Sequence, residues 1–117
     1  MLGWHWLAHT EQGAAAVLGE PGRLETLLLD LASTLDLTPV APPLVRPVAG
    51  GLAGVLLLAE SHAAVHVDLG AGAAMIDVFS CRAIDGAQAA ARVAAALGAA
   101  PSWELRSRGV LPAGASA

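Results

Sequence analysis

Leucine residues recur at helical spacing in the first third of the chain. They share one face of a helix if the chain is helical there, at positions 24, 27, 28, 31 and 35. This spacing predicts an amphipathic helix over residues 22–37. A second helix is expected over residues 85–98, because Asp85 suits the N-cap position and Gly98 suits a C-terminal stop.

The other apolar segments have the patterns of β-strands. Some alternate between apolar and polar residues, and one, "LAGVLLLAE", is apolar on both faces, which is typical of a central strand. The expected strands cover residues 4–9, 52–60, 62–68, 74–81 and 102–110. Residues 38–51 contain four prolines, so this segment can form only an extended edge strand or a loop.

The order of these elements predicts an α+β fold. It reads β-α-β-β-β-α-β, which is typical of a two-layer sandwich in which two helices cover one face of an antiparallel sheet. The length of 117 residues suits a single domain, which we expect over residues 1–110. Residues 111–117 are expected to form a flexible tail.

Composition narrows the classes of function. A hydrophobic fraction of 56% with 14% charged residues favours a folded core over disorder. The apolar runs are too short or too alanine-rich for a membrane span, and no signal-peptide pattern begins the chain. The net charge of −4 argues against nucleic-acid and membrane partners. A single cysteine cannot form an internal disulfide, so a cytoplasmic location is expected.

Reactive residue types gather in one window of this apolar chain. Ser61, His62, His66 and the only cysteine, Cys81, lie within it. Because the strands there are joined by short turns, we expect Ser61, His66 and Cys81 to converge at one end of the sheet. Two of these features have an ordinary structural explanation. A lone cysteine is usually a small core residue, and a Ser-His step at a strand end is usually a turn.

A serine in such a setting has two possible roles as a nucleophile. It can attack a substrate, or it can attack the preceding carbonyl, here that of Glu60, and turn the amide into an ester. β-Elimination would then break the chain and leave a pyruvoyl group, which forms a Schiff base with an amine and accepts electrons as pyridoxal phosphate does. A histidine and a cysteine suit the base and the acid that this chemistry needs. We assign no role to His5 or His9 and expect Asp77 to be structural.

Three short motifs resemble those of the prokaryotic pyruvoyl-dependent S-adenosylmethionine decarboxylases. They are "AESH" at 59–62, His66, and "DVFSC" at 77–81, and a weaker likeness extends from Gly3 and His5 to the last strand. The resemblance implies self-cleavage between Glu60 and Ser61 into a β chain (1–60) and an α chain (61–117). Ser61 would become the pyruvoyl group, with no metal and no pyridoxal phosphate.

The same resemblance implies the roles of the other residues and the partners. His66 would be the proton acceptor in processing, and Cys81 the proton donor to the decarboxylated carbon. The processed protomers would form a homodimer with active sites near the interface. The implied reaction converts S-adenosylmethionine to its decarboxylated form for spermidine synthesis.

Departures from the family pattern leave the substrate open. The chain has "HVDLG" at 66–70 where the family has "HTWPE", so Asp68 replaces a tryptophan and Gly70 replaces the glutamate that grips the ribose. Ala53 replaces a serine that assists processing, and Pro47 stands where an aromatic residue is expected. One alternative is therefore a decarboxylase of L-arginine or L-ornithine, with Asp68 pairing with the distal cation. Another is a non-processing regulatory or binding homologue.

Overall fold

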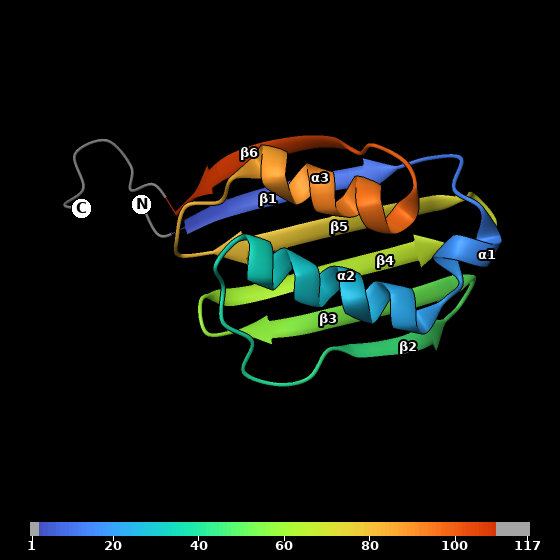
Figure 1. The fold of residues 1–117 in the computed structure, drawn as a ribbon, viewed down its shortest axis with the longest axis horizontal. Coiled ribbons are helices and arrows are strands. Elements are labelled where there is room, and N and C mark those ends of the chain that lie inside the picture. Colours follow the sequence, from blue (N-terminus) through green and yellow to red (C-terminus); the bar gives the residue numbers. More distant parts are fainter. Residues whose placement is uncertain (1–2, 110–117) are drawn as a thin grey trace.

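The computed structural model describes residues 3–109 and shows one six-stranded antiparallel sheet covered on one face by helices (Figure 1). The strands are β1 (Gly3–Thr10), β2 (Leu44–Val48), β3 (Gly51–Leu58), β4 (Ser61–Asp68), β5 (Ala73–Ser80) and β6 (Ser102–Arg108). The helices are α1 (Ala15–Leu18), α2 (Pro21–Thr34) and α3 (Gly86–Leu97). The strand order is β2-β3-β4-β5-β1-β6. The predicted α+β sandwich is confirmed, and the tail expected over 111–117 lies outside the described residues.

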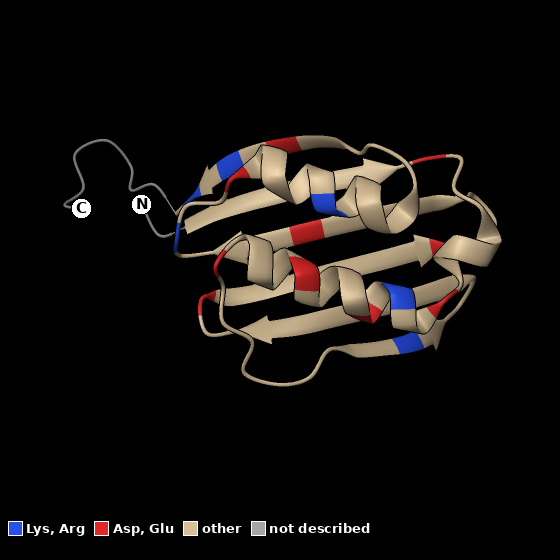
Figure 2. Ribbon diagram, in the orientation of Figure 1, with Lys and Arg blue, Asp and Glu red and all other residues tan. Residues whose placement is uncertain are grey.

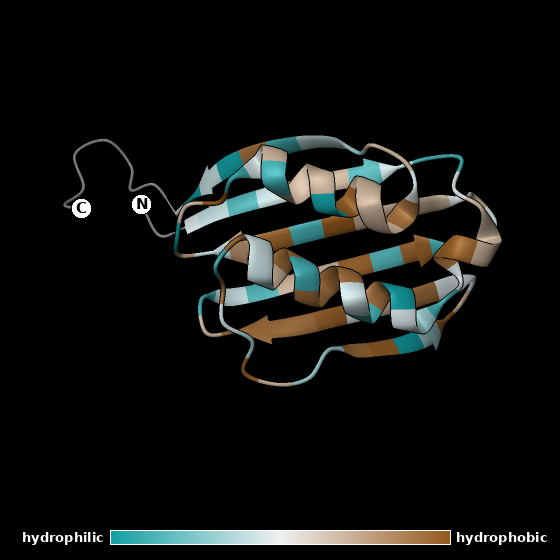
Figure 3. Cartoon of the chain, in the orientation of Figure 1, coloured by the Kyte–Doolittle hydropathy of each residue, from teal (hydrophilic) through white to brown (hydrophobic). Residues whose placement is uncertain are grey.

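The proline-rich segment forms the edge strand β2, and its position agrees with its composition. β2 contains one proline, Pro47, and pairs only with β3 among the described strands. An edge strand is the place in a sheet where proline is tolerated. The strand expected over residues 52–60 corresponds to β3, which lies next to the edge strand β2 in the sheet. Figure 3 shows β3 hydrophobic along most of its length, whereas β4 and β5 alternate hydrophobic with hydrophilic positions.

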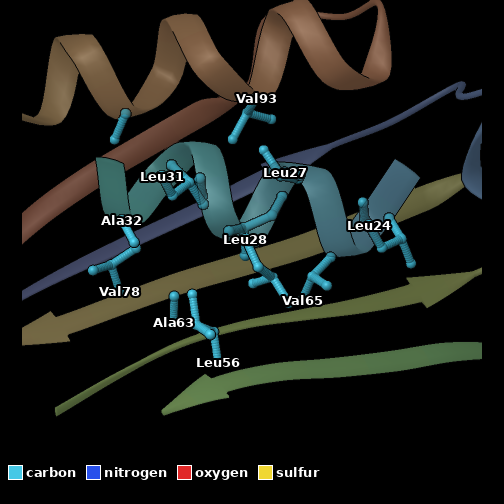
Figure 4. Close-up of a cluster of buried hydrophobic side chains, with 14 of the residues drawn as sticks. Leu24, Leu27, Leu28, Leu31, Ala32, Leu56, Ala63, Val65, Val78 and Val93 are labelled. Atoms are coloured by element: carbon cyan, nitrogen blue, oxygen red, sulfur yellow. The ribbon is translucent and has the colours of Figure 1, made fainter. Parts of the chain in front are cut away.

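The core lies between the sheet and the leucine face of α2 (Figure 4). The leucines of α2 that point to the sheet are fully buried: Leu24, Leu27, Leu28 and Leu31. They meet alternate residues of the central strands, among them Leu56, Val65 and Val78, while α3 adds Val93. Full burial of one such side chain stabilises the fold by about 1.5–3 kcal/mol, so this face holds the helix on the sheet.

Helix α2 ends earlier than its hydrophobic spacing predicts, at Thr34 rather than Leu37. Asp36 has a left-handed backbone with a φ of 57°. The Leu37 N–H donates to the carbonyl of Ala32 at 2.8 Å, and the Asp36 N–H donates to that of Ser33 at 3.3 Å. This is a Schellman turn, which stops the helix and sends the chain to the end of the sheet.

Helix α3 has the two ends that its sequence predicts. The Asp85 side chain accepts a hydrogen bond from the Gln88 N–H at 3.1 Å, which caps the first turn. Gly98 follows the last turn with a φ of 75°, a conformation that glycine adopts at little cost.

The face of the sheet that lies away from the helices is uncovered in the described chain and carries several exposed apolar side chains beside polar ones. Five aliphatic side chains on this face are at least 40% exposed: Leu44, Val48, Val55, Leu57 and Met75. Charged residues are scattered singly in Figure 2, mostly on helices, loops and strand ends. Within residues 3–109 no helix is both long and apolar enough to cross a membrane. An apolar patch of this kind commonly marks a surface that another protein covers.

Candidate active site

Ser61 and Cys81 come together at one end of the sheet. Ser61 begins β4 and lies opposite Ser80, the last residue of the antiparallel neighbour β5. Cys81 is the next residue, and it is exposed. Glu60 lies in the tight turn that joins β3 to β4. The antiparallel register thus brings the Glu60–Ser61 bond beside the only thiol of the chain.

The carbonyl group of Glu60 already has a hydrogen-bond donor. The backbone N–H of Cys81 donates to the Glu60 oxygen at 3.2 Å. If Ser61 attacks this carbonyl carbon, negative charge develops on that oxygen. A fixed backbone donor stabilises such an oxyanion more in the transition state than in the resting amide.

The backbone at Ser61 is strained. Its φ is 150°, in a region that residues with a side chain rarely adopt. Such a conformation costs on the order of 1–3 kcal/mol and persists only where the surrounding structure holds it. This torsion is about the N–Cα bond of Ser61, which adjoins the peptide bond that self-cleavage would break.

The segment after α2 makes contacts with Glu60 and with Arg82, which lies next to Cys81. The Glu60 carboxylate accepts hydrogen bonds from the Thr38 N–H at 2.8 Å and from the Thr38 hydroxyl at 3.1 Å. The bond from the Thr38 backbone lowers the pKa of the Glu60 carboxyl below its ordinary value. Arg82 donates to the carbonyl and the carboxylate of Asp36, at 2.9 and 3.2 Å. The segment that follows α2 therefore contacts both Glu60 and the residue that follows Cys81.

A line of polar side chains leads away from Ser61 across the open face. The Ser61 Oγ lies 3.1 Å from Nδ1 of His62, and Nε2 of His62 lies 3.2 Å from Oδ2 of Asp77. The same oxygen lies 2.8 Å from Nε2 of His5. At the end of this line, Nη1 of Arg108 lies 3.0 Å from Nδ1 of His5. Although two histidines flank Asp77, no group of three or more His, Cys, Asp and Glu residues within 3–109 is arranged to hold a metal ion.

The sequence reasoning assigned no role to His5 and only a structural one to Asp77. These residues meet because β1 lies beside β5, where His5 pairs with Phe79, as does His62 from the other side. The sequence does show that these residues occupy polar positions in strands that alternate between apolar and polar residues. Which strands are neighbours is a long-range property that alternation does not reveal.

His66 does not converge with Ser61 within one chain, contrary to the expectation. Both residues lie on β4, five positions apart on an extended strand, which separates them by about 16 Å. His66 pairs with Ala53 on β3 and Met75 on β5, and it is exposed on the open face. There it lines a shallow groove of about 1100 Å³ that also reaches His5 and Asp77.

Comparison with known proteins decides the family. The family model for S-adenosylmethionine decarboxylase matches residues 4–106. The chain belongs to this family. The solved structure of the adenosylmethionine decarboxylase from Aquifex aeolicus has the same fold, with a TM-score of 0.80, 23% identity, and coverage of 99% of this chain and 98% of that one.

Two archaeal S-adenosylmethionine decarboxylase proenzymes are similar in sequence. The protein of Pyrococcus furiosus is 26% identical over 80 residues, which is 68% of this chain and 58% of that protein. The protein of Thermococcus kodakarensis is 29% identical over 80 residues, or 68% of this chain and 56% of the relative. The match thus spans somewhat more than half the length of each relative.

The positions that depart from the decarboxylase family pattern lie far from Ser61. Asp68 ends β4, and its Oδ1 accepts a hydrogen bond from the Ala71 N–H at 3.0 Å, which tightens the turn to β5. Gly70 is exposed in that turn. Ala53 lies beside His66 on the open face. These three positions therefore lie away from Ser61, toward the other end of β4.

Pro47, which stands where an aromatic residue is expected, does not lie on the open face of the sheet. It pairs with Leu52, which is buried against the helices, so Pro47 lies on the helix side of the sheet. The neighbouring residue Arg46 pairs with Ala53 and so shares the open face.

Proposed function

We propose that this chain is a proenzyme that cleaves itself between Glu60 and Ser61 and then acts as an S-adenosylmethionine decarboxylase. The observation that carries the proposal is the arrangement at this bond: a strained Ser61 follows a carbonyl that the Cys81 N–H already holds. Membership of the decarboxylase family and similarity to two proteins named as proenzymes support it.

The proposed self-cleavage has three steps. Ser61 Oγ bonds to the Glu60 carbonyl carbon, and the C–N bond breaks as the nitrogen takes a proton, which leaves an ester. Removal of the Ser61 Cα proton then breaks the Cβ–O bond and releases Glu60 as the carboxyl terminus of the β chain, 1–60. Water displaces the nitrogen as ammonia, which leaves a pyruvoyl group at the start of the α chain, 61–117.

The pyruvoyl group supplies a carbonyl that condenses with the substrate amine and accepts the electrons of decarboxylation. We assign to Cys81 the return of a proton to the substrate carbon. It follows the strand position opposite Ser61, and its thiol is exposed. General acid catalysis from this position accounts for the role proposed for Cys81.

His66 fits its proposed role only across a dimer. About 16 Å of extended strand separates it from Ser61 of its own chain, so it cannot take the Ser61 Cα proton there. The apolar open face that carries His66 is uncovered. We infer a homodimer in which two open faces meet, so that His66 of the partner subunit reaches Ser61 and each interface holds two equivalent sites.

A second candidate substrate is a basic amino acid, either L-arginine or L-ornithine. Stacking of adenine needs an aromatic surface. Among the Phe and Trp residues of the described strands, Phe79 is the one on the open face, so this face offers adenine little aromatic surface. Asp68 adds a carboxylate at the end where the groove residue His66 lies. A carboxylate is the group that binds an ammonium or guanidinium most strongly.

Release of labelled carbon dioxide tests the substrate. The purified protein is incubated with carboxyl-labelled S-adenosylmethionine, L-arginine or L-ornithine at equal concentration, with the Ser61→Ala variant as a blank. We expect release from S-adenosylmethionine that is fastest of the three and absent in the blank. Faster release from either amino acid would replace the proposed substrate, and release by the Ser61→Ala variant would contradict a pyruvoyl mechanism.

A further inference from the structure

Hydrogen bonds connect Arg108, His5, Asp77, His62 and Ser61 in a line. If both histidines are neutral, only one assignment of donors and acceptors fits all of these contacts. An arginine side chain only donates, so Nδ1 of His5 accepts from Arg108, and Nε2 of His5 carries the hydrogen toward Asp77. The carboxylate of Asp77 only accepts, so Nε2 of His62 also donates to it. Nδ1 of a neutral His62 therefore carries a lone pair, 3.1 Å from Ser61 Oγ.

Packing holds both imidazoles in these orientations. Phe79 lies between them, with ring centroids 5.6 Å from His5 and 6.2 Å from His62. The guanidinium of Arg108 lies over the Phe79 ring, 5.4 Å from its centroid. The side chains of His5, Asp77 and His62 are 16%, 31% and 38% exposed, so solvent competes only in part for these hydrogen bonds.

We propose that His62 is the base that takes the Ser61 hydroxyl proton in the first step of self-cleavage, and that Asp77 positions it. This inference rests on the proposed function. A serine, a histidine and a carboxylate in hydrogen-bonded sequence form the arrangement that activates a weak hydroxyl nucleophile. Here Nδ1 faces the serine and Nε2 faces the carboxylate, and the nucleophile attacks its own chain.

The proton path closes without any added reagent. As Ser61 Oγ bonds to the Glu60 carbonyl carbon, its proton moves to Nδ1 of His62, and the Asp77 carboxylate stabilises the imidazolium that forms. His62 then gives this proton to the Ser61 nitrogen as the C–N bond breaks. The histidine returns to its neutral state, and the product is the ester.

This step is distinct from the one assigned to His66. The ester must next lose its Cα proton, which is the step proposed for His66 of the partner subunit. His62 adjoins Ser61 in the same chain, so the first step needs one chain and the second needs two. Hydroxylamine separates the two steps, because it cleaves an ester and leaves an amide intact.

The experiment follows the appearance of the 61–117 fragment in freshly refolded His62→Ala, His62→Asn and Asp77→Asn chains, each with and without hydroxylamine. His62→Asn keeps an acceptor near the Nδ1 position but cannot take a proton. His9→Ala serves as a histidine control, since its partner in the structure is Glu11, at 3.8 Å, outside the line. Thermal unfolding shows whether each variant is folded.

We expect both His62 variants to form fragments at least about 100-fold more slowly, with no release by hydroxylamine. Added imidazole should partly restore cleavage of His62→Ala, and Asp77→Asn should show a smaller loss. Cleavage of both His62 variants at the unaltered rate would overturn the proposal. Stalled variants that hydroxylamine splits would also overturn it, because the ester would have formed without His62. If the unaltered chain itself stays intact, the proposed function fails, a result visible before any variant is made.

Discussion

The two ends of strand β4 differ in backbone strain, in hydrogen bonding and in their match to the family motifs. At the Ser61 end, the backbone is strained and surrounding groups hold the carbonyl, the carboxylate and the hydroxyl near the cleavage point. At the Asp68 end, the chain turns through the exposed residues Leu69, Gly70 and Ala71. The first end keeps the family motif "AESH", and the second departs from the family pattern.

This difference separates two requirements of the proposed function. Activation of the scissile bond needs close contacts within one chain, and the fold supplies them at the Ser61 end. In the proposed homodimer, recognition of the substrate would use groups at the far end of the strand, which would approach Ser61 only from the second chain. Small residues at that far end are therefore compatible with the self-cleavage proposed at the Ser61 end.

Mixed dimers test this separation with the largest expected effect. His66→Ala alone should cleave about 10²–10⁴-fold more slowly, because the ester loses its proton acceptor. In a mixed dimer with Ser61→Ala, the His66→Ala chain faces an intact His66 of the partner subunit. We expect its cleavage to recover, measured by mass spectrometry of a tagged chain. A mixed dimer that stays as slow as His66→Ala alone would mean that His66 does not act between chains.

Replacement of Cys81 should affect turnover and spare cleavage. Cys81→Ala keeps the backbone N–H that donates to the Glu60 carbonyl, so the fragments should still form. Decarboxylation should slow by about 10²–10⁴-fold, because the substrate carbon loses its proton donor. The measurement is the turnover number of the fully cleaved variant. An unchanged turnover number would return Cys81 to a purely structural role.

Replacement of Asp68 probes the opposite end with a smaller effect. In Asp68→Asn the side-chain oxygen can still accept the Ala71 N–H and keep the turn. Turnover of S-adenosylmethionine should therefore change less than about twofold, whereas any turnover of L-arginine or L-ornithine should fall about tenfold as a charge-assisted bond is lost. Kinetics on the three substrates check this. A tenfold loss with S-adenosylmethionine would place Asp68 in its binding site.

The Glu60 contact gives the smallest expected effect, a pH dependence of stability. Because the Thr38 N–H lowers the pKa of Glu60 in the folded chain, the contact stabilises the fold above the ordinary pKa of glutamate. The contribution is lost as the pH falls through the lowered value. Thermal unfolding of Ser61→Ala and of Ser61→Ala with Glu60→Gln should therefore differ at neutral pH and converge in strong acid. A difference that persists in strong acid would contradict this origin.

Much of the fold was predictable because its signals are local. The leucine spacing predicted α2, and Asp85 and Gly98 predicted the ends of α3. The end of α2 was missed because Asp36 adopts a left-handed backbone, a position at which glycine would have been the usual signal.

The candidate site was predictable only where it depends on motif spacing. The window from Ser61 to Cys81 indicated two residues that do meet at the sheet end. The prediction that His66 converges with Ser61 within one chain was wrong, because the two residues lie five positions apart on one extended strand. The contacts of His5 with Asp77 require β1 to lie beside β5, and no local pattern encodes that neighbour.

Intact mass of the purified, unaltered protein tests the central claim most directly. The account predicts two fragments, residues 1–60 and residues 61–117, with the second lighter than its sequence by one molecule of ammonia. The Ser61→Ala chain should remain whole under the same conditions, because no hydroxyl can attack the Glu60 carbonyl. A single intact chain of 11.7 kDa in the unaltered protein would contradict the account and favour a non-processing binding or regulatory homologue.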